Sequence, residues 1–425
     1  MRIFHLLILA LIPSLFMPLL AQNQENQKPI TLANCLEAAR QNYPATRQKL
    51  LIQQNRQDQL TSLTRNYLPQ VNLNAQATYQ SAVTSVPISS NLFKIIPPDK
   101  DQYKVTADLS QILFDGGITE AQKSMASAQA LVDESKLEQE LYRLKEKVTQ
   151  LYLGILLLDK QLEQLTLLEK DLQENYRKVT ALKANGLSNE NNLDLIRAEQ
   201  LRLEQKRLEL KSARTATLQG LSLLSGLNLD ENSKLLVPEK PILKDEIIRP
   251  ELQTLRNQQE LLGSQLSLTQ RKLVPKAMLF GQAGYGKPGL NMLKNEFEWF
   301  YLAGARITWN PSTLYTLGKE KQIIKRNSDA LKLQQESFVL QTRVGLQQAK
   351  SEIEKAENLI LVDEELLKLR KRIRQNASIR LAEGILSASD YIHELLQEEQ
   401  VLMNKSLHEI QLLSGYFNYQ LNSGN

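Results

Sequence analysis

Residues able to carry out catalysis are few in this chain, and they stand far apart. The histidines are His5, His393 and His408, and Cys35 is the only cysteine. None of them has partners at the spacings that metal sites use. The sequence also offers no phosphate-binding glycine loop and no credible pairing of a nucleophile with a base. We therefore predict that the protein is not an enzyme and needs no metal or cofactor.

The densest charge in the sequence is a short basic run. Its members are Arg370, Lys371, Arg372, Arg374 and Arg380. We interpret it as a solvated helix face, or as residues paired with acidic neighbours such as Glu364 and Glu365. The net charge of +5 over 425 residues gives no reason to expect nucleic acid. A glycine-rich stretch, residues 281–289, is interpreted as a turn at the end of a strand.

The first 21 residues have the pattern of a secretory signal peptide. Arg2 provides a positive start, an apolar stretch with two prolines follows, and Ala21 is a plausible cleavage site. A retained membrane anchor is the alternative, against which the prolines count. A secreted chain with one cysteine has no disulfide within it, so we expect Cys35 to be a small buried residue of the first helix.

Two segments without proline, residues 118–183 and 318–383, predict very long helices. At 1.5 Å per residue, each spans roughly 100 Å. In the first segment, apolar residues recur with alternating spacings of four and three, which is the period of a left-handed coiled coil. They are Leu137, Leu141, Leu144, Val148, Leu151, Ile155, Leu158, Leu162 and Leu165. Helices this long must pack along partners, for which the candidates are residues 31–66, 189–225, 251–273 and 388–420.

Four segments alternate apolar and polar residues as strands do. They are residues 70–80, 102–114, 275–286 and 297–310. Each is long enough for a tilted strand to cross a bilayer, which takes about 9–11 residues. Lys104, Asp108 and Arg306 share the polar face, as the inner wall of a water-filled barrel requires. The alternative is a pair of soluble hairpins at the end of a coiled coil.

The same order of elements occurs twice: helix, strand pair, very long helix, glycine turn, helix. We predict two tandem repeats, residues 22–229 and 251–425, joined by a linker at residues 230–250. Four strands are too few to close a barrel, and open sheet edges are not tolerated in hydrocarbon. Several copies of the chain must therefore share one barrel.

The ordered series of motifs resembles the TolC family of outer-membrane efflux proteins over nearly the whole mature chain. The matching segments are residues 30–39, Asn42-Tyr43-Pro44, residues 67–71, Leu113-Phe114-Asp115-Gly116-Gly117 and the two glycine turns. The second junction, Trp309-Asn310-Pro311, departs from the pattern because it lacks Asp-Gly-Gly.

The resemblance implies a mainly α-helical protein with a membrane β part. Its long antiparallel coiled-coil α-barrel would continue into a β-barrel of twelve strands, with four from each subunit of a homotrimer. The protein would lie in the outer membrane of a Gram-negative bacterium, with a long periplasmic extension. It would be a passive conduit for efflux or secretion that docks a periplasmic adaptor and an inner-membrane transporter. The competing interpretation is a periplasmic coiled-coil structural or adaptor protein without a pore.

The resemblance also implies where the functional residues lie. The adaptor would dock on the turns between helices, at Gly186, Leu187, Ser188, Gly384 and Ile385. Ordinary turn chemistry explains the two glycines equally well, because glycine ends helices in a left-handed conformation.

The pore constriction would form at Asp390 and His393. Asn192 takes the place of Asp390 in the first repeat. A ring of three Asp390 carboxylates would attract cations. The alternative is a carboxylate that is favoured at a helix N-terminus by the helix dipole.

Overall fold

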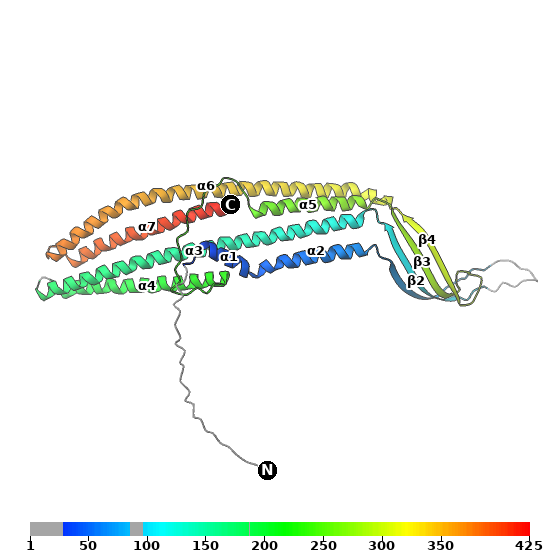
Figure 1. The fold of residues 1–425 in the computed structure, drawn as a ribbon, viewed down its shortest axis with the longest axis horizontal. Helices are drawn as coiled ribbons and strands as arrows, with labels where there is room; N and C mark the ends of the chain where they lie inside the picture. Colours follow the sequence, from blue (N-terminus) through cyan, green and yellow to red (C-terminus); the bar gives the residue numbers. More distant parts are fainter. Residues whose placement is uncertain (1–28, 86–96, 187) are drawn as a thin grey trace, which may run out of the picture.

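The computed structural model describes residues 29–85, 97–186 and 188–425. The predicted signal peptide, residues 1–21, lies outside the described residues. The molecule is elongated, with helices along most of its length and a small sheet at one end (Figure 1). This mainly helical architecture with a β part is the predicted one.

The first helical segment is broken where the sequence predicted one helix over residues 31–66. Helix α1 (Leu32–Asn42) and helix α2 (Gln48–Arg65) are separated by a 3₁₀ turn, Pro44–Arg47. Tyr43 is extended, with ψ of 125°. The cause is Pro44, which disfavours the helical conformation of the residue before it and has no N–H to donate. The prediction of a continuous helix is therefore wrong.

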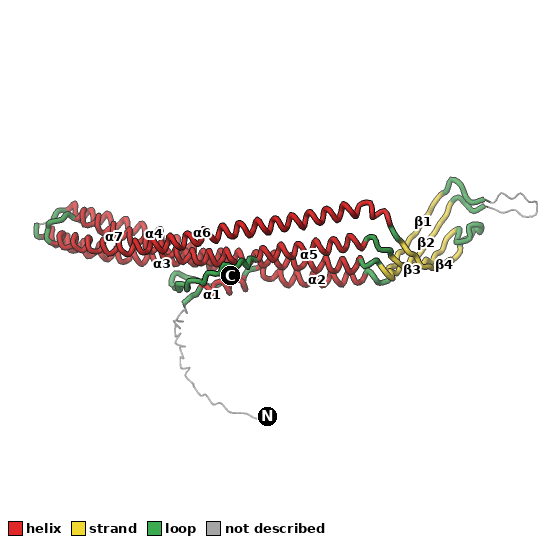
Figure 2. Tube along the Cα trace, turned by 90° about the horizontal axis from the view of Figure 1, so that it is seen from above, coloured by secondary structure: helices red, strands yellow, loops and turns green. Residues whose placement is uncertain are grey.

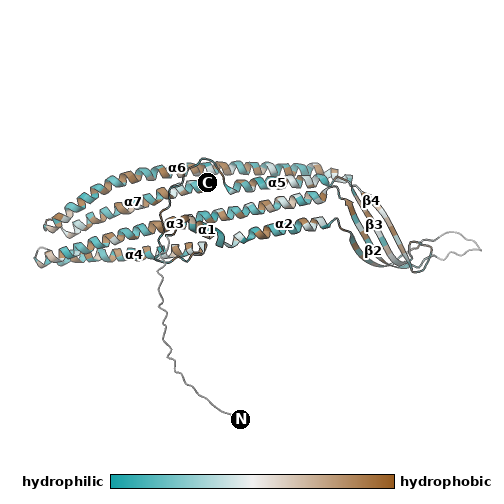
Figure 3. Ribbon diagram, viewed as in Figure 1, coloured by the Kyte–Doolittle hydropathy of each residue, from teal (hydrophilic) through white to brown (hydrophobic). Residues whose placement is uncertain are grey.

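The two long helices are α3 (Ile118–Ala184) and α6 (Leu314–Ala382), of 67 and 69 residues. Each turns back at its far end into a shorter helix, α4 (Glu190–Ser225) after α3 and α7 (Ala388–Ser423) after α6. Helix α5 (Pro250–Arg271) leads into the second strand pair. All of these helices mix hydrophilic and hydrophobic residues along their length (Figure 3).

None of the helices in the described part of the chain combines the length and the apolar character of a membrane span.

The helices form a curved layer with a fixed lateral order (Figures 1 and 2). In the half near the sheet the order is α2, α3, α5, α6. In the far half it is α4, α3, α7, α6. Helices α2 and α4 therefore form one side edge of the layer, and α6 forms the other.

The predicted coiled-coil face of α3 is the core of this layer. Leu137, Leu144, Val148 and Ile155 are buried against α1, α4 and α7. Cys35 on α1 is also fully buried in this cluster, as predicted, and burial raises the pKa of its thiol to about 11. A second cluster joins α3, α4, α6 and α7 in the far half.

The sheet has four antiparallel strands in chain order. They are β1 (Gln70–Tyr79), β2 (Asp101–Phe114), β3 (Lys276–Lys287) and β4 (Glu298–Thr308). Hydrogen bonds join β1 to β2, β2 to β3 and β3 to β4, and no other strand of the described residues pairs with the outer edges of β1 and β4.

Strand β3 covers nearly the predicted residues 275–286, so the interpretation of residues 281–289 as a turn is wrong for Gly281, Gly284 and Gly286. These glycines remain in the strand because neighbouring strands pair with their backbone groups and, at Gly284, because the Phe300 ring covers the place of a side chain. The fourth strand ends at Thr308, so Trp309 follows it and donates a hydrogen bond from Nε1 to the carbonyl of Leu273.

Candidate functional site

The two glycine turns lie together at the end of the molecule opposite the sheet (Figure 1). Gly186 has φ of +74° and Gly384 has φ of +71°, a left-handed conformation that glycine adopts at little cost. Three residues later, Asn189 caps α4 and Ser387 caps α7. The matching positions show one turn used twice, and its chemistry alone accounts for both glycines.

The predicted docking residues are open to solvent at these turns. The Ile385 side chain is 65% exposed. Apart from the glycines' own chain neighbours, no atom of the described residues lies within 4 Å of the positions where Gly186 or Gly384 would carry a Cβ atom. Ser188 is half-buried, and its Oγ accepts a hydrogen bond from Asn192 at 3.1 Å. Leu187 lies outside the described residues.

Asp390 belongs to the cap of α7. Its backbone N–H donates to Ser387 Oγ at 3.1 Å, and its carboxylate accepts from the same hydroxyl at 2.7 Å. Asn192 stands at the equivalent position of α4, with its N–H bonded to Asn189 Oδ1 at 3.1 Å. Both Asp390 and His393 are exposed. The carboxylate therefore completes a helix cap and still faces solvent.

The basic run has different partners from the predicted ones. Arg370 binds Glu394 at 3.1 Å, and Arg374 binds Glu398 at 2.6 Å, so both reach across to α7. Arg374 also contacts Asp171 of α3 at 3.4 Å. Pairing with Glu364 and Glu365 is therefore the wrong interpretation for Arg370 and Arg374. Lys371, Arg372 and Arg380 are exposed, as a solvated helix face predicts.

A buried carboxyl group, which the sequence analysis did not single out, lies beside this network. Glu399 is buried on α7, and its Oε1 atom has no hydrogen-bond partner among the residues that the structure describes. Burial, followed by the charges of Glu398 and Asp171, raises the pKa of Glu399 to about 7. Nearby, Asn175 of α3 donates a hydrogen bond to the Tyr391 hydroxyl of α7 at 2.8 Å. No local signal marks these residues, because their partners come from distant parts of the chain.

At the other end of the molecule, the sheet has two unlike faces. We call one the apolar face, because between the strand ends it carries no charge; Asp101 begins β2 and Lys287 ends β3. Trp299 and Tyr301 on this face are 81% and 82% exposed. The pairing aligns its large members across the strands: Val71 with Leu109, and Val105 with Tyr285 and Trp299.

We call the opposite side the charged face. Its charged strand residues are Lys104, Asp108, Lys276, Glu298 and Arg306. The structure thus places Lys104, Asp108 and Arg306 on one side, as the alternation predicted. A sheet that is apolar on one side and charged on the other suits a wall between lipid and water.

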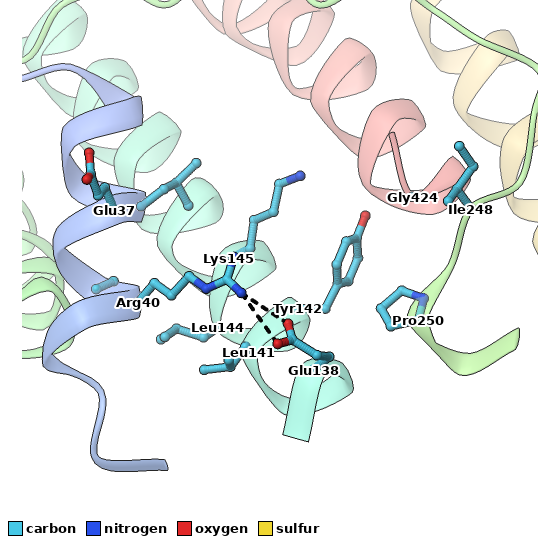
Figure 4. A pocket seen from close by; sticks show the side chains of 12 residues that line it. Glu37, Arg40, Glu138, Leu141, Tyr142, Leu144, Lys145, Ile248, Pro250 and Gly424 are labelled. Atoms are coloured by element: carbon cyan, nitrogen blue, oxygen red, sulfur yellow. Dashed lines mark hydrogen bonds and ion pairs between the residues drawn. The ribbon is translucent and has the colours of Figure 1, made fainter. Parts of the chain in front are cut away.

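A pocket with charged residues at its margin lies near the middle of the helices. Figure 4 shows this pocket of about 500 Å³ between α1, α3 and the linker. Arg40 binds Glu138 at 3.3 Å at its margin. Lys145 lies over the Tyr142 ring, and burial lowers the pKa of its ammonium group. No group of His, Cys, Asp and Glu in the described residues is arranged to hold a metal ion.

Comparison with known proteins identifies the first repeat. Residues 35–227 match the outer membrane efflux protein family. Comparison with proteins of curated function found no match.

Solved structures share the fold over most of the chain. The outer membrane protein VceC of Vibrio cholerae superposes with a TM-score of 0.69 at 15% identity, over 93% of this chain and 96% of VceC. The CmeC outer membrane channel of Campylobacter jejuni gives 0.68 at 15% identity, over 92% of this chain and 85% of CmeC. The MtrE outer membrane channel of Neisseria gonorrhoeae gives 0.68 at 15% identity, over 93% and 89%.

The family match in the first repeat, the shared fold and the two-faced sheet agree with one another. The chain is therefore an outer-membrane protein whose first repeat matches the outer membrane efflux protein family and whose fold is that of the solved outer-membrane channels.

Proposed function

We propose that the chain is one subunit of a homotrimeric outer-membrane channel of a tripartite efflux or secretion system. Three copies would join their sheets into one twelve-stranded barrel and their helices into one periplasmic tunnel. The tunnel would dock a periplasmic adaptor and an inner-membrane transporter, which supplies the energy. The subunit itself is a passive conduit.

The observation that carries this proposal is the sheet. It exposes an apolar face rich in aromatic residues, and both of its outer edges, on β1 and β4, are unpaired within the described part of the chain. Unpaired backbone groups cost several kcal/mol each in hydrocarbon. A sheet with an exposed apolar face is therefore stable in lipid only after its edges pair. Pairing β4 of one copy with β1 of the next satisfies both edges and repeats around a closed ring.

The helical layer supports the same head-to-tail contact. Its α6 edge carries exposed apolar residues with helical spacing, at Leu333, Leu340 and Val344 near the sheet. Its other edge carries exposed apolar residues on both α2 and α4; they are Leu50, Leu51, Leu201 and Leu208. These two edges continue the β4 and β1 edges of the sheet, so one neighbouring copy covers sheet and helices together.

The far end of the tunnel would hold the docking and constriction residues. The turns carrying Gly186, Gly384 and Ile385 are the most protruding part of the helices (Figure 1), so an adaptor reaches them without entering the tunnel. In a trimer, Asp390 and His393 would stand near the three-fold axis at this end. Since Asp390 is exposed, three copies would create a negative constriction.

The test is to purify the full chain from cell membranes in mild detergent. We expect a trimer that resists dissociation in unheated SDS gels and forms ion-conducting pores in planar bilayers. The protein should stay with the outer membrane after washes with salt and alkali. A water-soluble monomer that leaves with those washes and never conducts would overturn the proposal in favour of a periplasmic coiled-coil protein.

A further inference from the structure

The charged face of the sheet contains the same arrangement twice, a glycine, a phenylalanine and a cation. Phe300 of β4 lies opposite Gly284 of β3, and Phe280 of β3 lies opposite Gly304 of β4. A Cβ atom on Gly284 would come within 2.5 Å of the Phe300 ring, and one on Gly304 within 2.9 Å of the Phe280 ring. The outer end of each ring therefore lies directly over the glycine of the neighbouring strand.

A cation rests on each of these rings. Lys104 Nζ lies 4.8 Å from the centroid of the Phe300 ring, and Arg306 Cζ lies 4.8 Å from that of Phe280. Phe300 is only 8% exposed, which shows how closely its neighbours cover it. The aromatic faces attract the cations without neutralising them. The two rings thus hold both cations against the charged face of the sheet.

The carboxylates of the same face are occupied by other partners. Asp108 accepts hydrogen bonds from Gln282 at 2.5 Å, Asn74 at 2.5 Å and Thr106 at 3.3 Å, all neutral donors. Glu298 pairs with Lys294 beyond the strand end. Among the described residues, neither Lys104 nor Arg306 forms a salt bridge. Both cations are therefore available to a solute.

We infer that Lys104 and Arg306 form an anion-recruiting belt inside the channel, which favours the passage of anionic solutes through the strand region. The inference rests on the proposed trimeric channel, in which the belt holds three copies of each cation. Lys276 adds a third cation to the face of each subunit, beside Thr308 at the helix-proximal end of the sheet. Charges on one wall of a narrow aqueous passage raise the local concentration of counter-ions.

The experiment measures the reversal potential of single channels in a KCl gradient near 0.1 M, which gives the chloride-to-potassium permeability ratio. Removing both charges, by Lys104→Gln with Arg306→Gln, should lower the chloride-to-potassium permeability ratio about twofold or more. The effect should shrink near 1 M salt, where the Debye length falls to about 3 Å. Lys104→Arg with Arg306→Lys keeps both charges and should keep the ratio. Asp108→Asn should raise it.

A second variant tests the inference even if the double variant assembles poorly. Arg306→Cys introduces a reactive thiol into a chain whose only cysteine, Cys35, is fully buried. A positively charged thiol reagent should restore the ratio of the unmodified wild-type channel, and a negatively charged reagent should lower it further. All variants retain Asp390, so changes report on the strand region.

The outcomes separate the two ideas. A wild-type chain without any conductance overturns the proposed channel. The other outcome is a conducting channel whose permeability ratio is the same for the charge-neutral variant, the charge-preserving variant and both thiol reagents. That outcome would support the proposed channel and contradict the anion-recruiting belt.

Discussion

Glu399 is the residue whose surroundings most oppose its usual charge. It is buried among helices that already place Glu398 and Asp171 nearby, and Arg374 binds both of those carboxylates instead of Glu399. The folded protein therefore favours the neutral form, with the pKa raised from 4.5 to about 7. The contribution of the neutral Glu399 carboxyl to the free energy of unfolding is complete below about pH 4.5 and is lost as the pH rises through 7.

We predict that Glu399→Gln raises the thermal unfolding midpoint at pH 8 and leaves it unchanged at pH 4.5. One pKa unit corresponds to about 1.4 kcal/mol, so removing the buried charge at pH 8 should raise the free energy of unfolding by an amount on the order of 3 kcal/mol. The measurement is far-ultraviolet circular dichroism of the detergent-solubilised protein at both pH values. Glu352→Gln, at an exposed position of α6, is the control and should show no such difference. Equal shifts at both pH values would contradict the assignment.

The charge of Asp390 can be removed without loss of the N-terminal cap of α7. The Ser387 hydroxyl accepts from the backbone N–H of Asp390, and the first repeat has Asn192 at the same position. We predict that Asp390→Asn leaves the trimer intact and lowers the cation-to-anion permeability ratio about twofold or more. Single-channel recording in a salt gradient measures this ratio. Glu190→Gln, in the first turn of α4, is the control. Traces identical to wild type would remove Asp390 from the constriction.

Elements with a strong periodic signal were predicted within a few residues of their bounds. The alternation of four and three along α3 and the period of two along β2 identify a helix and a strand. The break at Pro44 follows from a local rule, because the residue before a proline disfavours the helical conformation. The apolar pattern of the segment continues across the break and therefore predicted one helix. Gly284 and Gly286 lie within the strand that alternation predicted, residues 275–286, although their glycine-rich composition alone suggested a turn. The ion pairs of Arg374 were hidden from local patterns, since Asp171 comes from the other repeat.

The tip of the second hairpin offers a test of docking that does not disturb the fold. Ile385 is 65% exposed and belongs to none of the buried clusters of the described residues, so its replacement removes no packing. We predict that Ile385→Asp lowers export at least about tenfold, because a charge placed in an apolar contact loses its water. The readout is accumulation of a fluorescent efflux dye in cells that depend on this channel.

The matched control is Glu383→Gln in the same turn, which should export normally. Unheated gels must show that every variant still forms trimers. Normal dye export by the Ile385→Asp trimer would rule out the docking role of this turn.

At the scale of the whole molecule, one lateral order extends from the sheet into the helices. The strands run β1 to β4 and the helices α2 to α6, so the open edges of both layers lie on the same two sides. A neighbour that pairs with β4 must also cover the exposed apolar residues of α6. Strand pairing and helix packing therefore have to form together, and a fault in either one should weaken the ring.

We predict that Leu340→Glu on α6 prevents trimer formation and leaves the protomer folded. Leu340 is exposed in the single chain, so its replacement leaves the protomer core intact. In the trimer the new carboxylate would be buried without a partner, which costs about 3 kcal/mol or more at each interface. Gln341→Glu adds the same charge at the next position, off the apolar stripe, and should assemble normally. Unheated gels give the oligomeric state and circular dichroism the helix content, so a Leu340→Glu trimer as resistant as wild type would mean that α6 does not form the subunit contact.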